Sequence, residues 1–229
     1  MGPGHDDENR RRALRLAAQF QQAYAEALLS GTPRAAEMVI REAIEAGLDE
    51  AMIDDEVIRP ALQLVGDLWA DGHLSVGEEH LATSISMRII VLQREAFRAS
   101  RQRASQRILL AGAQGEQHVV GLQMAASLIL SAGYDVRLMG ADLPVGEIAS
   151  AMRAHDPSVV GFTTASSLTS VRMPAAFEAV RSVSAEVGIL VGGRGVDEAW
   201  AARWDLVICR HVADAVEQVD ALVKHARGN

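Results

Sequence analysis

The hydrophobic pattern of the chain changes at Arg107, and this change limits the possible folds more than any other feature of the sequence. After Arg107, short apolar runs typical of strands alternate with stretches of helical period. The predicted strands cover 107–112, 135–139, 158–163, 187–191 and 205–209, and the predicted helices cover 118–132, 145–154, 171–185, 196–202 and 211–226. Because right-handed crossovers between parallel strands place helices on both faces of a sheet, we expect an α/β domain over residues 107–228 with a five-stranded, parallel, doubly wound sheet.

The residues before Arg107 show only helical period. The predicted helices cover about 8–30, 33–46, 55–71 and 76–99. Thr32 and Pro33 suit the N-cap and the first position of the second helix, and Gly47 suits its end. The apolar stripe expected on the fourth helix consists of Leu81, Ile85, Ile89, Leu92 and Ala96. Helices with short connections predict a four-helix bundle over residues 8–99, followed by a polar linker at 99–107.

Composition excludes several classes of function. The net charge is −8, whereas a nucleic-acid-binding face needs an excess of Lys and Arg, so we expect no direct nucleic-acid partner. Cys209 is the only cysteine and falls in a strand predicted to be buried, which excludes a disulfide framework and a cysteine-based zinc site. The first residues, Met1 to Arg12, are polar and charged, and no apolar run is as long as a membrane span. We therefore expect a cytoplasmic protein with no membrane partner.

Loops follow the first four predicted strands at their carboxyl ends, which is the edge where open α/β sheets bind ligands. The first loop contains Glu116 and His118, and the second covers 140–144. An imidazole at this edge can ligate a metal while a carboxylate orients it, although a solvated or capping histidine is the more ordinary role. The third loop, 163–168, carries hydroxyl groups that can cap the following helix or bind a polar ligand. The glycine-rich fourth loop, 192–195, suits a tight turn or close approach of the backbone to a ligand.

Three short motifs in these loops resemble those of a known family, the cobalamin-binding domains. The motifs are Glu116-x-His118-x-x-Gly121, Ser166-x-Leu168 and Gly192-Gly193. They are similar in order and in strand placement to the family's D/E-x-H-x-x-G, S-x-L and G-G motifs. The preceding helical segment is similar to the family's helical cap, so the resemblance covers nearly the whole chain.

The resemblance implies a Rossmann-like (flavodoxin-like) domain that binds cobalamin. His118 would be the lower axial ligand of cobalt, in place of the cofactor's own dimethylbenzimidazole, and Glu116 would accept the other ring N–H. The displaced nucleotide tail would enter a slot beside the sheet. The residues implied to line this slot or to pack against the tail are Gly121, Ser166, Leu168, Gly192 and Gly193.

The helical half carries a second match. Trp69 is followed after nine residues by Glu79 and His80, which resembles the W-x9-E-H motif of the CarH-like, adenosylcobalamin-dependent photoreceptors. The resemblance implies that the bundle covers the upper face of adenosylcobalamin, that Trp69 packs on the adenosyl group, and that Glu79 and His80 hydrogen-bond to it. Without the resemblance, Trp69 suits the bundle core, and Glu79 and His80 suit an exposed first helical turn.

Two features depart from that family. Ala70 stands where those photoreceptors have a histidine that binds cobalt after photolysis, so a two-histidine photoproduct is in doubt, although His73 lies one turn further on. The family also carries an N-terminal helix-turn-helix DNA-binding domain, for which the residues before the predicted bundle leave no room. We therefore expect a standalone sensor that acts on a separate output or regulator protein.

Together the motifs imply a light sensor and not an enzyme. Light would break the cobalt–carbon bond of adenosylcobalamin, and the loss of the adenosyl group would change the packing of the cap in a homo-oligomer, a dimer or a tetramer. A related standalone group, the photocobilins, also binds a linear tetrapyrrole, so a bilin such as biliverdin is a further candidate cofactor. Two alternatives stay open: a corrinoid protein that carries methyl groups for a methyltransferase, and a relative that has lost its cofactor.

Overall fold

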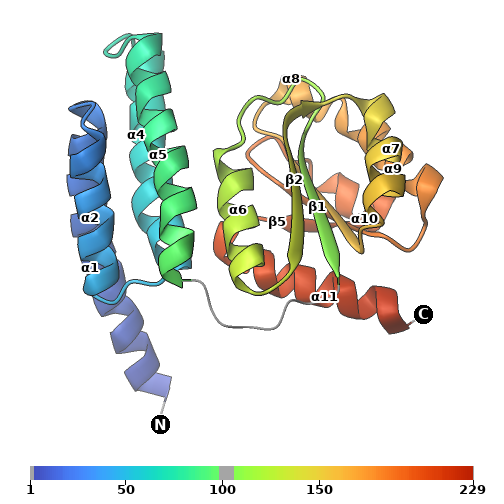
Figure 1. Ribbon diagram of the computed structural model, residues 1–229, viewed down its shortest axis with the longest axis horizontal. Helices are drawn as coiled ribbons and strands as arrows, with labels where there is room; N and C mark the ends of the chain where they lie inside the picture. The colour runs from blue at the N-terminus through green and yellow to red at the C-terminus, as the bar shows by residue number, and fades with distance from the viewer. Residues whose placement is uncertain (1–2, 98–105, 229) are drawn as a thin grey trace. The chain divides into compact units, whose positions relative to one another are not determined.

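The computed structural model describes residues 3–97 and 106–228, and the chain divides into two compact units, Met1–Arg98 and Ala99–Asn229 (Figure 1). The linker predicted at 99–107 lies, except for its last two residues, outside the described residues. Within those residues, no helix combines the length and the apolar character that crossing a bilayer requires.

The N-terminal unit is built from packed helices. They are α1 (Pro3–Leu29), α2 (Pro33–Glu45), α3 (Glu50–Met52), the π-helix η1 (Ile53–Ile58), α4 (Arg59–Ala70) and α5 (Val76–Phe97). Because α3, η1 and α4 follow one another without a break, they form the third predicted helical stretch, which begins at Glu50 and not at 55. Thr32 stands at the N-cap of α2, but its side chain makes no cap hydrogen bond, and its hydroxyl lies 3.4 Å from the carbonyl oxygen of Ser30.

The π-helical segment changes which side chains the third stretch buries. The backbone N–H of Arg59 donates to the carbonyl oxygen of Asp54, five residues earlier. Pro60 follows in the first turn of α4, and it has no backbone N–H with which to continue the hydrogen bonding of η1. The wider turn places Asp54 and Asp55 inside the unit, with exposures of 0% and 5%.

The apolar stripe predicted for α5 is wrong at two positions. Ile85 and Ile89 are buried as expected, but Leu81 and Leu92 are 44% and 46% exposed, and the side chain of Ala96 lies outside the described residues. The buried face of α5 instead consists of Ala82, Ile85, Ser86, Ile89, Ile90 and Gln93. The two polar members of this face have buried partners. The hydroxyl of Tyr24 lies 3.0 Å from that of Ser86, and the amide of Gln93 donates to Asp54 at 2.7 Å.

The C-terminal unit is a five-stranded parallel sheet in the order β2-β1-β3-β4-β5, which confirms the predicted doubly wound α/β fold. Its strands are β1 (Arg107–Ala113), β2 (Asp135–Leu143), β3 (Val159–Thr163), β4 (Gly188–Gly192) and β5 (Val207–Cys209). Its helices are α6 (Val120–Ser131), α7 (Val145–His155), α8 (Ser167–Ser170), α9 (Met173–Val183), α10 (Ala199–Trp204), η2 (Val212–Asp214) and α11 (Ala215–Gly228). The helix predicted at 171–185 corresponds to α9, and α8 is a further short helix that begins within the loop predicted at 163–168.

Helices cover both faces of the sheet, and β1 shows why (Figure 1). Successive side chains of a strand point to opposite faces. Ile108 and Leu110 pack with α6 and α11, whereas Leu109 and Ala111 pack with α7, α9 and α10. A strand buried on both faces has a continuous apolar sequence, which is the pattern that predicted a parallel sheet.

Two expectations about the strands are corrected. Residues 140–143, predicted as a loop, belong to β2, which continues past irregular pairing with β1 and carries positive φ at Gly140 (+83°) and Asp142 (+52°). β5 is half-buried and not fully buried, and Cys209 within it donates from Sγ to the carbonyl oxygen of His211 at 3.1 Å.

Candidate functional site

His118 lies in the loop between β1 and α6, with its side chain 72% exposed. Its Nδ1 lies 2.7 Å from Oε1 of Glu116, and the same oxygen accepts the backbone N–H of His118 at 2.8 Å. A carboxylate partner assigns the proton to Nδ1, which leaves the lone pair of Nε2 on the outer side of the ring. An oriented neutral imidazole with a free Nε2 is a ready ligand for a transition metal.

Glu116 is completely buried beneath this imidazole. Its second oxygen, Oε2, accepts the backbone N–H of Ala165 at 2.6 Å and the hydroxyl of Thr169 at 2.9 Å. Burial alone would raise the pKa of Glu116, but the hydrogen bonds from Ala165, His118 and Thr169 outweigh it and lower the pKa. The carboxylate is therefore a fixed negative charge that orients His118, and Thr169 is a supporting residue that the sequence motifs did not single out.

The third loop brings its hydroxyls to the same edge. Ser166 is the N-cap of α8, where its side chain accepts the backbone N–H of Thr169 at 3.3 Å, so the capping role proposed for this loop is confirmed for Ser166. Two apolar side chains at this short helix are exposed to solvent. Leu168, within α8, is 79% exposed, and Val171, the residue that follows α8, is 76% exposed. Exposed apolar side chains at a ligand-binding edge are suited to contact a large organic ligand.

The glycines of the motifs serve different purposes. A Cβ at Gly193 would clash with the carbonyl oxygen of Thr164, and Gly195 donates its N–H to that oxygen at 2.9 Å, so both hold the fourth loop against the third. Gly192, at the end of β4, would place a Cβ 3.3 Å from the carbonyl oxygen of Cys209. At Gly121, in the first turn of α6, a Cβ would meet no atom within 4 Å. Of the three motif glycines, Gly121 is therefore the one that has open space where a side chain would stand.

Asp142 ties β2 to the loop that carries His118. Its Oδ1 accepts the N–H of Gly115 at 2.6 Å, and its own N–H donates to the carbonyl oxygen of Glu116 at 2.9 Å. The left-handed conformation of Asp142 allows both bonds at once, which gives this residue a supporting role.

Trp69, Glu79 and His80 lie on either side of one turn of the helical unit. Trp69 is in the last turn of α4 and is 49% exposed, so the alternative that assigned it to the bundle core is wrong. Glu79 is half-buried and accepts the hydroxyl of Thr83 at 2.9 Å, while His80 lies 3.7 Å from it with its side chain 72% exposed. The turn between α4 and α5 therefore presents an indole, a carboxylate and an imidazole at one end of the bundle.

A capping box fixes this turn. Ser75 donates its backbone N–H and its hydroxyl to Oε2 of Glu78, each at 2.7 Å, and the N–H of Glu78 lies 3.3 Å from the Ser75 hydroxyl oxygen. These hydrogen bonds from Ser75 lower the pKa of Glu78. The S-x-x-E sequence was a readable signal for this cap, and it defines where α5 begins.

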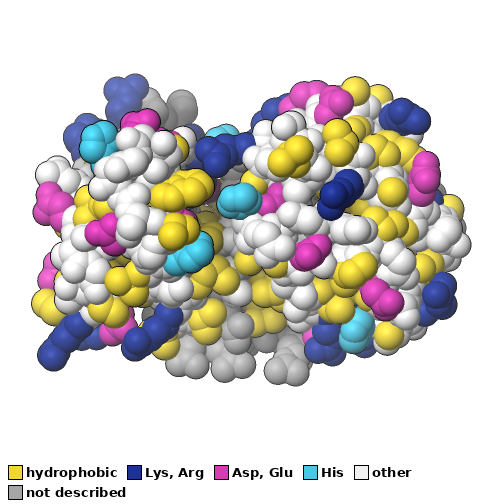
Figure 2. Space-filling model, turned by 90° about the horizontal axis from the view of Figure 1, so that it is seen from above, with side chains coloured by type: hydrophobic (Ala, Val, Ile, Leu, Met, Phe, Trp, Pro, Cys, Tyr) yellow, Lys and Arg dark blue, Asp and Glu magenta, His cyan; other side chains and the backbone are white. Residues whose placement is uncertain are grey.

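The donor set fits a metal that brings most of its own ligands. Among the described residues, no group of three or more His, Cys, Asp or Glu side chains is placed to hold a metal ion. One exposed imidazole with a buried carboxylate behind it supplies a single axial position, and Gly121 and Leu168 supply open space and apolar surface nearby. Figure 2 looks onto the carboxyl edge of the sheet and shows histidine side chains (cyan) at the surface.

Comparison with known proteins gives matches over both units. Two B12 binding domain models match, one over residues 106–220, half of the chain, and one over residues 21–91. The HTH-type transcriptional repressor CarH of Myxococcus xanthus is 28% identical over 214 residues, 91% of this chain and 68% of that protein.

Corrinoid proteins match over a similar length. The trimethylamine corrinoid protein of Methanosarcina barkeri is 26% identical over 204 residues, 86% of this chain and 93% of that protein. The structure of the Methanosarcina barkeri monomethylamine corrinoid protein aligns with a TM-score of 0.73 at 12% identity, over 89% of this chain and 97% of that one, which is a likeness of fold.

Proposed function

Because this chain belongs to the B12 binding domain family, we propose that it is a light sensor that uses adenosylcobalamin. His118 would hold the cobalt of the cofactor through Nε2, and Glu116 would keep the proton of the ring on Nδ1. The nucleotide tail of the cofactor would occupy the space beside Gly121, and Leu168 would give it an apolar contact. Bound adenosylcobalamin supplies the photochemistry, a cobalt–carbon bond that visible light breaks.

The helical unit contributes the residues that hold the adenosyl group. In this proposal Trp69 covers its apolar surface, and Glu79 and His80 hydrogen-bond to its polar atoms. The observation that carries the proposal is the 49% exposure of Trp69, next to the turn that leads to Glu79. A large aromatic side chain that the bundle does not bury is available to a ligand, and its contact is lost when that ligand leaves.

The test is illumination of the full chain loaded with adenosylcobalamin in the dark. Green light should cause a lasting change in the absorbance spectrum and a change in mass by size exclusion, since the proposed readout is a homo-oligomer whose interface depends on the cap. Trp69→Ala should bind adenosylcobalamin less tightly in the dark and reduce the light-dependent mass change. Leu64→Ala, which removes another exposed apolar side chain of α4 (40% exposed), is the matched control and should respond as the wild type does. A holoprotein that light does not change contradicts the proposal.

The cobalt ligand is tested separately. His118→Ala should weaken cobalamin binding and change the holo spectrum, because no imidazole then occupies the lower axial position. His155→Ala removes a histidine from the end of α7, outside the site, and should leave the spectrum unchanged. An unaltered spectrum in His118→Ala would remove this residue from the ligand role.

A second candidate function is methyl transfer by a corrinoid carrier. The observation that favours it is the match to the trimethylamine corrinoid protein at 26% identity, close to the 28% of CarH. A carrier would use His118 and the sheet in the same way, but it would accept a methyl group from a methyltransferase and would not need Trp69. A holoprotein that is inert to light and becomes methylated on reduction and incubation with a methyl donor system would establish this candidate.

Two further parts of the proposal concern what else the sensor binds. We propose a separate output protein as the partner of the light-dependent surface. A bilin such as biliverdin is an additional candidate cofactor, and the absorbance spectrum tests it directly: a red-absorbing band that appears on addition of biliverdin, beyond that of cobalamin, would support it, and an unchanged spectrum would dismiss it.

A further inference from the structure

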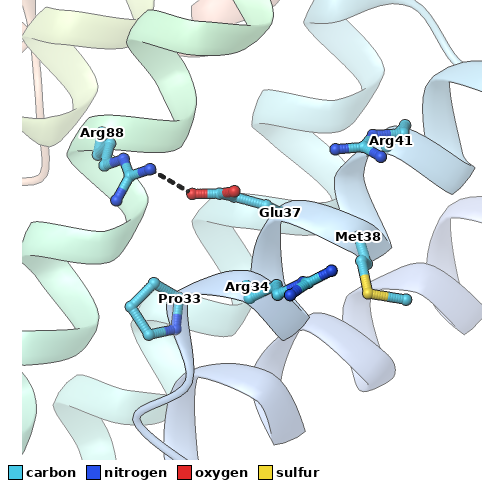
Figure 3. Close-up of a pocket in the computed structure, with 6 residues that line it drawn as sticks. All are labelled: Pro33, Arg34, Glu37, Met38, Arg41 and Arg88. Carbon is cyan, nitrogen blue, oxygen red and sulfur yellow. Dashed lines mark ion pairs between the residues drawn. The ribbon is translucent and has the colours of Figure 1, made fainter.

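A basic hollow lies on the helical unit, between α2 and α5 (Figure 3). Its volume is about 630 Å³, which is within the usual range for small-molecule sites. It is lined by Pro33, Arg34, Glu37, Met38, Arg41 and Arg88. Three guanidinium groups against one carboxylate give the hollow a net charge of +2, in a chain whose net charge is −8.

One of the three arginines is held in place by its own partner. Arg88 of α5 lies 2.8 Å from Oε1 of Glu37 on α2, as the dashed line in Figure 3 shows. This ion pair joins the two helices across the hollow and fixes the position of the Arg88 guanidinium. The side chain of Arg88 remains 63% exposed, so its other donors are available.

The other two arginines have no such partner. Within the part of the chain that the structure describes, Arg34 and Arg41 make no ion pair and no side-chain hydrogen bond. They are seven residues apart on α2, which places them on the same face of the helix, with Met38 between them. Met38 is 49% exposed and, with Pro33, gives the hollow an apolar wall between its charges.

The hollow is separate from the residues assigned to the cobalamin site. Arg88 follows Glu79 by nine residues on α5, and 100° per residue places the two side chains on opposite sides of that helix. The remaining lining residues belong to α2, from which the proposed cobalamin site takes no residue. A ligand here would bind to the bundle independently of the cofactor.

We propose that this hollow binds a small organic phosphate. A phosphate monoester carries close to two negative charges at neutral pH, which matches the net charge of the hollow, and its oxygens pair with guanidinium groups in the two-pronged geometry that arginine favours. The organic part of the ligand packs on Met38 and Pro33. A monocarboxylate would neutralise only half of the charge.

Titration calorimetry on the full chain tests the proposal with three probes. Phenyl phosphate should bind saturably and more tightly than inorganic phosphate, which lacks the apolar part, and benzoate should bind at least tenfold more weakly than phenyl phosphate. The Arg34→Gln/Arg41→Gln double variant should lose at least tenfold in affinity for both phosphates. Arg15→Gln, which removes an exposed positive charge from α1 outside the hollow, should bind as the wild type does.

Met38→Ala separates a built site from simple charge attraction. It should weaken phenyl phosphate at least threefold and leave inorganic phosphate unchanged, because only the phenyl ring contacts the methionine. Circular dichroism of each variant checks that the bundle is folded. The proposal is overturned if phenyl phosphate shows no saturable binding, if the Arg15→Gln variant loses as much affinity as the double variant, or if a glutamate-rich peptide binds more tightly than phenyl phosphate.

Discussion

At the scale of single residues, the candidate site depends on one buried carboxylate that is fully used as an acceptor. Glu116 receives N–H groups from His118 and Ala165 and a hydroxyl from Thr169, with no exposed surface of its own. A carboxylate has no hydrogen to donate, so four donors can converge on it without conflict. The orientation of His118 is therefore determined by Glu116 and, through it, by the third loop.

Glu116→Gln tests this dependence. The amide places an NH₂ group against N–H donors, so we expect cobalamin affinity to fall about 10- to 100-fold, as for other partners of metal-bound histidines. Glu147→Gln, an exposed acid in the first turn of α7, makes the same charge change and should keep full affinity. Equal affinities for the wild type and Glu116→Gln would show that Glu116 does not orient the ligand.

The lowered pKa of Glu116 also has a consequence for stability. Because the folded-state pKa lies below the unfolded-state value of about 4.3, the carboxylate stabilises the fold above that pH, and this contribution is lost as the pH falls through the folded pKa. The unfolding free energy of the wild type should therefore fall more steeply below pH 4.3 than that of Glu116→Gln. Denaturant titrations at pH 3 to 5 provide the measurement.

Gly121 gives a second test at this scale. A leucine there would meet no atom of the protein near its Cβ, so the fold should tolerate it, but the side chain would fill the space assigned to the nucleotide tail. We expect Gly121→Leu to keep its thermal stability to within a few degrees and to lose at least tenfold in cobalamin affinity. Gly146→Leu, also with open space around the Cβ and in the first turn of α7, is the control. Unchanged binding by Gly121→Leu would place the tail elsewhere.

At the scale of elements, the π-helix η1 buries an acid that no pattern in the sequence predicted to lie inside. Burial, with the nearby charge of Glu50, raises the pKa of Asp54 to about 8, against the effect of the hydrogen bond from Gln93. Its other oxygen, Oδ2, has no hydrogen-bond partner among the described residues. A protonated carboxyl at neutral pH is the form that suits this position.

This burial predicts that the helical unit loses stability as the pH rises. Between the unfolded pKa near 3.9 and the folded pKa of about 8, the folded state binds the extra proton, so the unfolding free energy falls by up to about 1.4 kcal/mol per pH unit. Asp54→Asn removes this slope and should make the unit more stable than the wild type at pH 8. Denaturant titrations at pH 5 and 8, with the exposed Asp67→Asn as control, measure both effects. A wild type as stable at pH 8 as at pH 5 contradicts the raised pKa.

The elements also show how far the sequence was informative. The central strands β1 and β3 were predicted correctly because they are apolar on both faces, a pattern that surface helices do not share. The buried face of α5 was not predicted correctly, because it includes the polar residues Ser86 and Gln93. These two are buried because Tyr24 and Asp54, from other helices, are their hydrogen-bond partners. Partners distant in sequence cannot be read from the period of one helix.

The site followed the same rule. The resemblance to the cobalamin-binding motifs pointed to His118 and Glu116, and the structure pairs these two residues within one loop. Thr169 and Asp142 support that loop from other elements, and neither had a local signal for this role. For Trp69, the helical period indicated the core, whereas its place in the last turn of α4 leaves it half exposed.

At the scale of the whole molecule, the two candidate functions differ in how many units the cofactor stabilises. A ligand stabilises only the unit that it binds. At a ligand concentration of one hundred times Kd, the unfolding free energy of that unit rises by about 2.7 kcal/mol. In a methyl carrier that does not need Trp69, the ligand contacts are made by the sheet unit through His118. In the proposed light sensor, Trp69, Glu79 and His80 add contacts from the helical unit, so adenosylcobalamin should stabilise both.

Domain-resolved hydrogen exchange makes this difference measurable. In the dark, adenosylcobalamin should slow exchange in β1 and α6 and also at the α4–α5 turn around Trp69, and illumination should restore exchange only at the turn, because the adenosyl group is the part that leaves. Trp69→Ala should lose the dark protection of the turn and keep that of β1. If cobalamin protects the sheet unit alone, in the dark as in the light, the helical unit does not sense the adenosyl group, and the carrier function becomes the better account of His118 and its sheet.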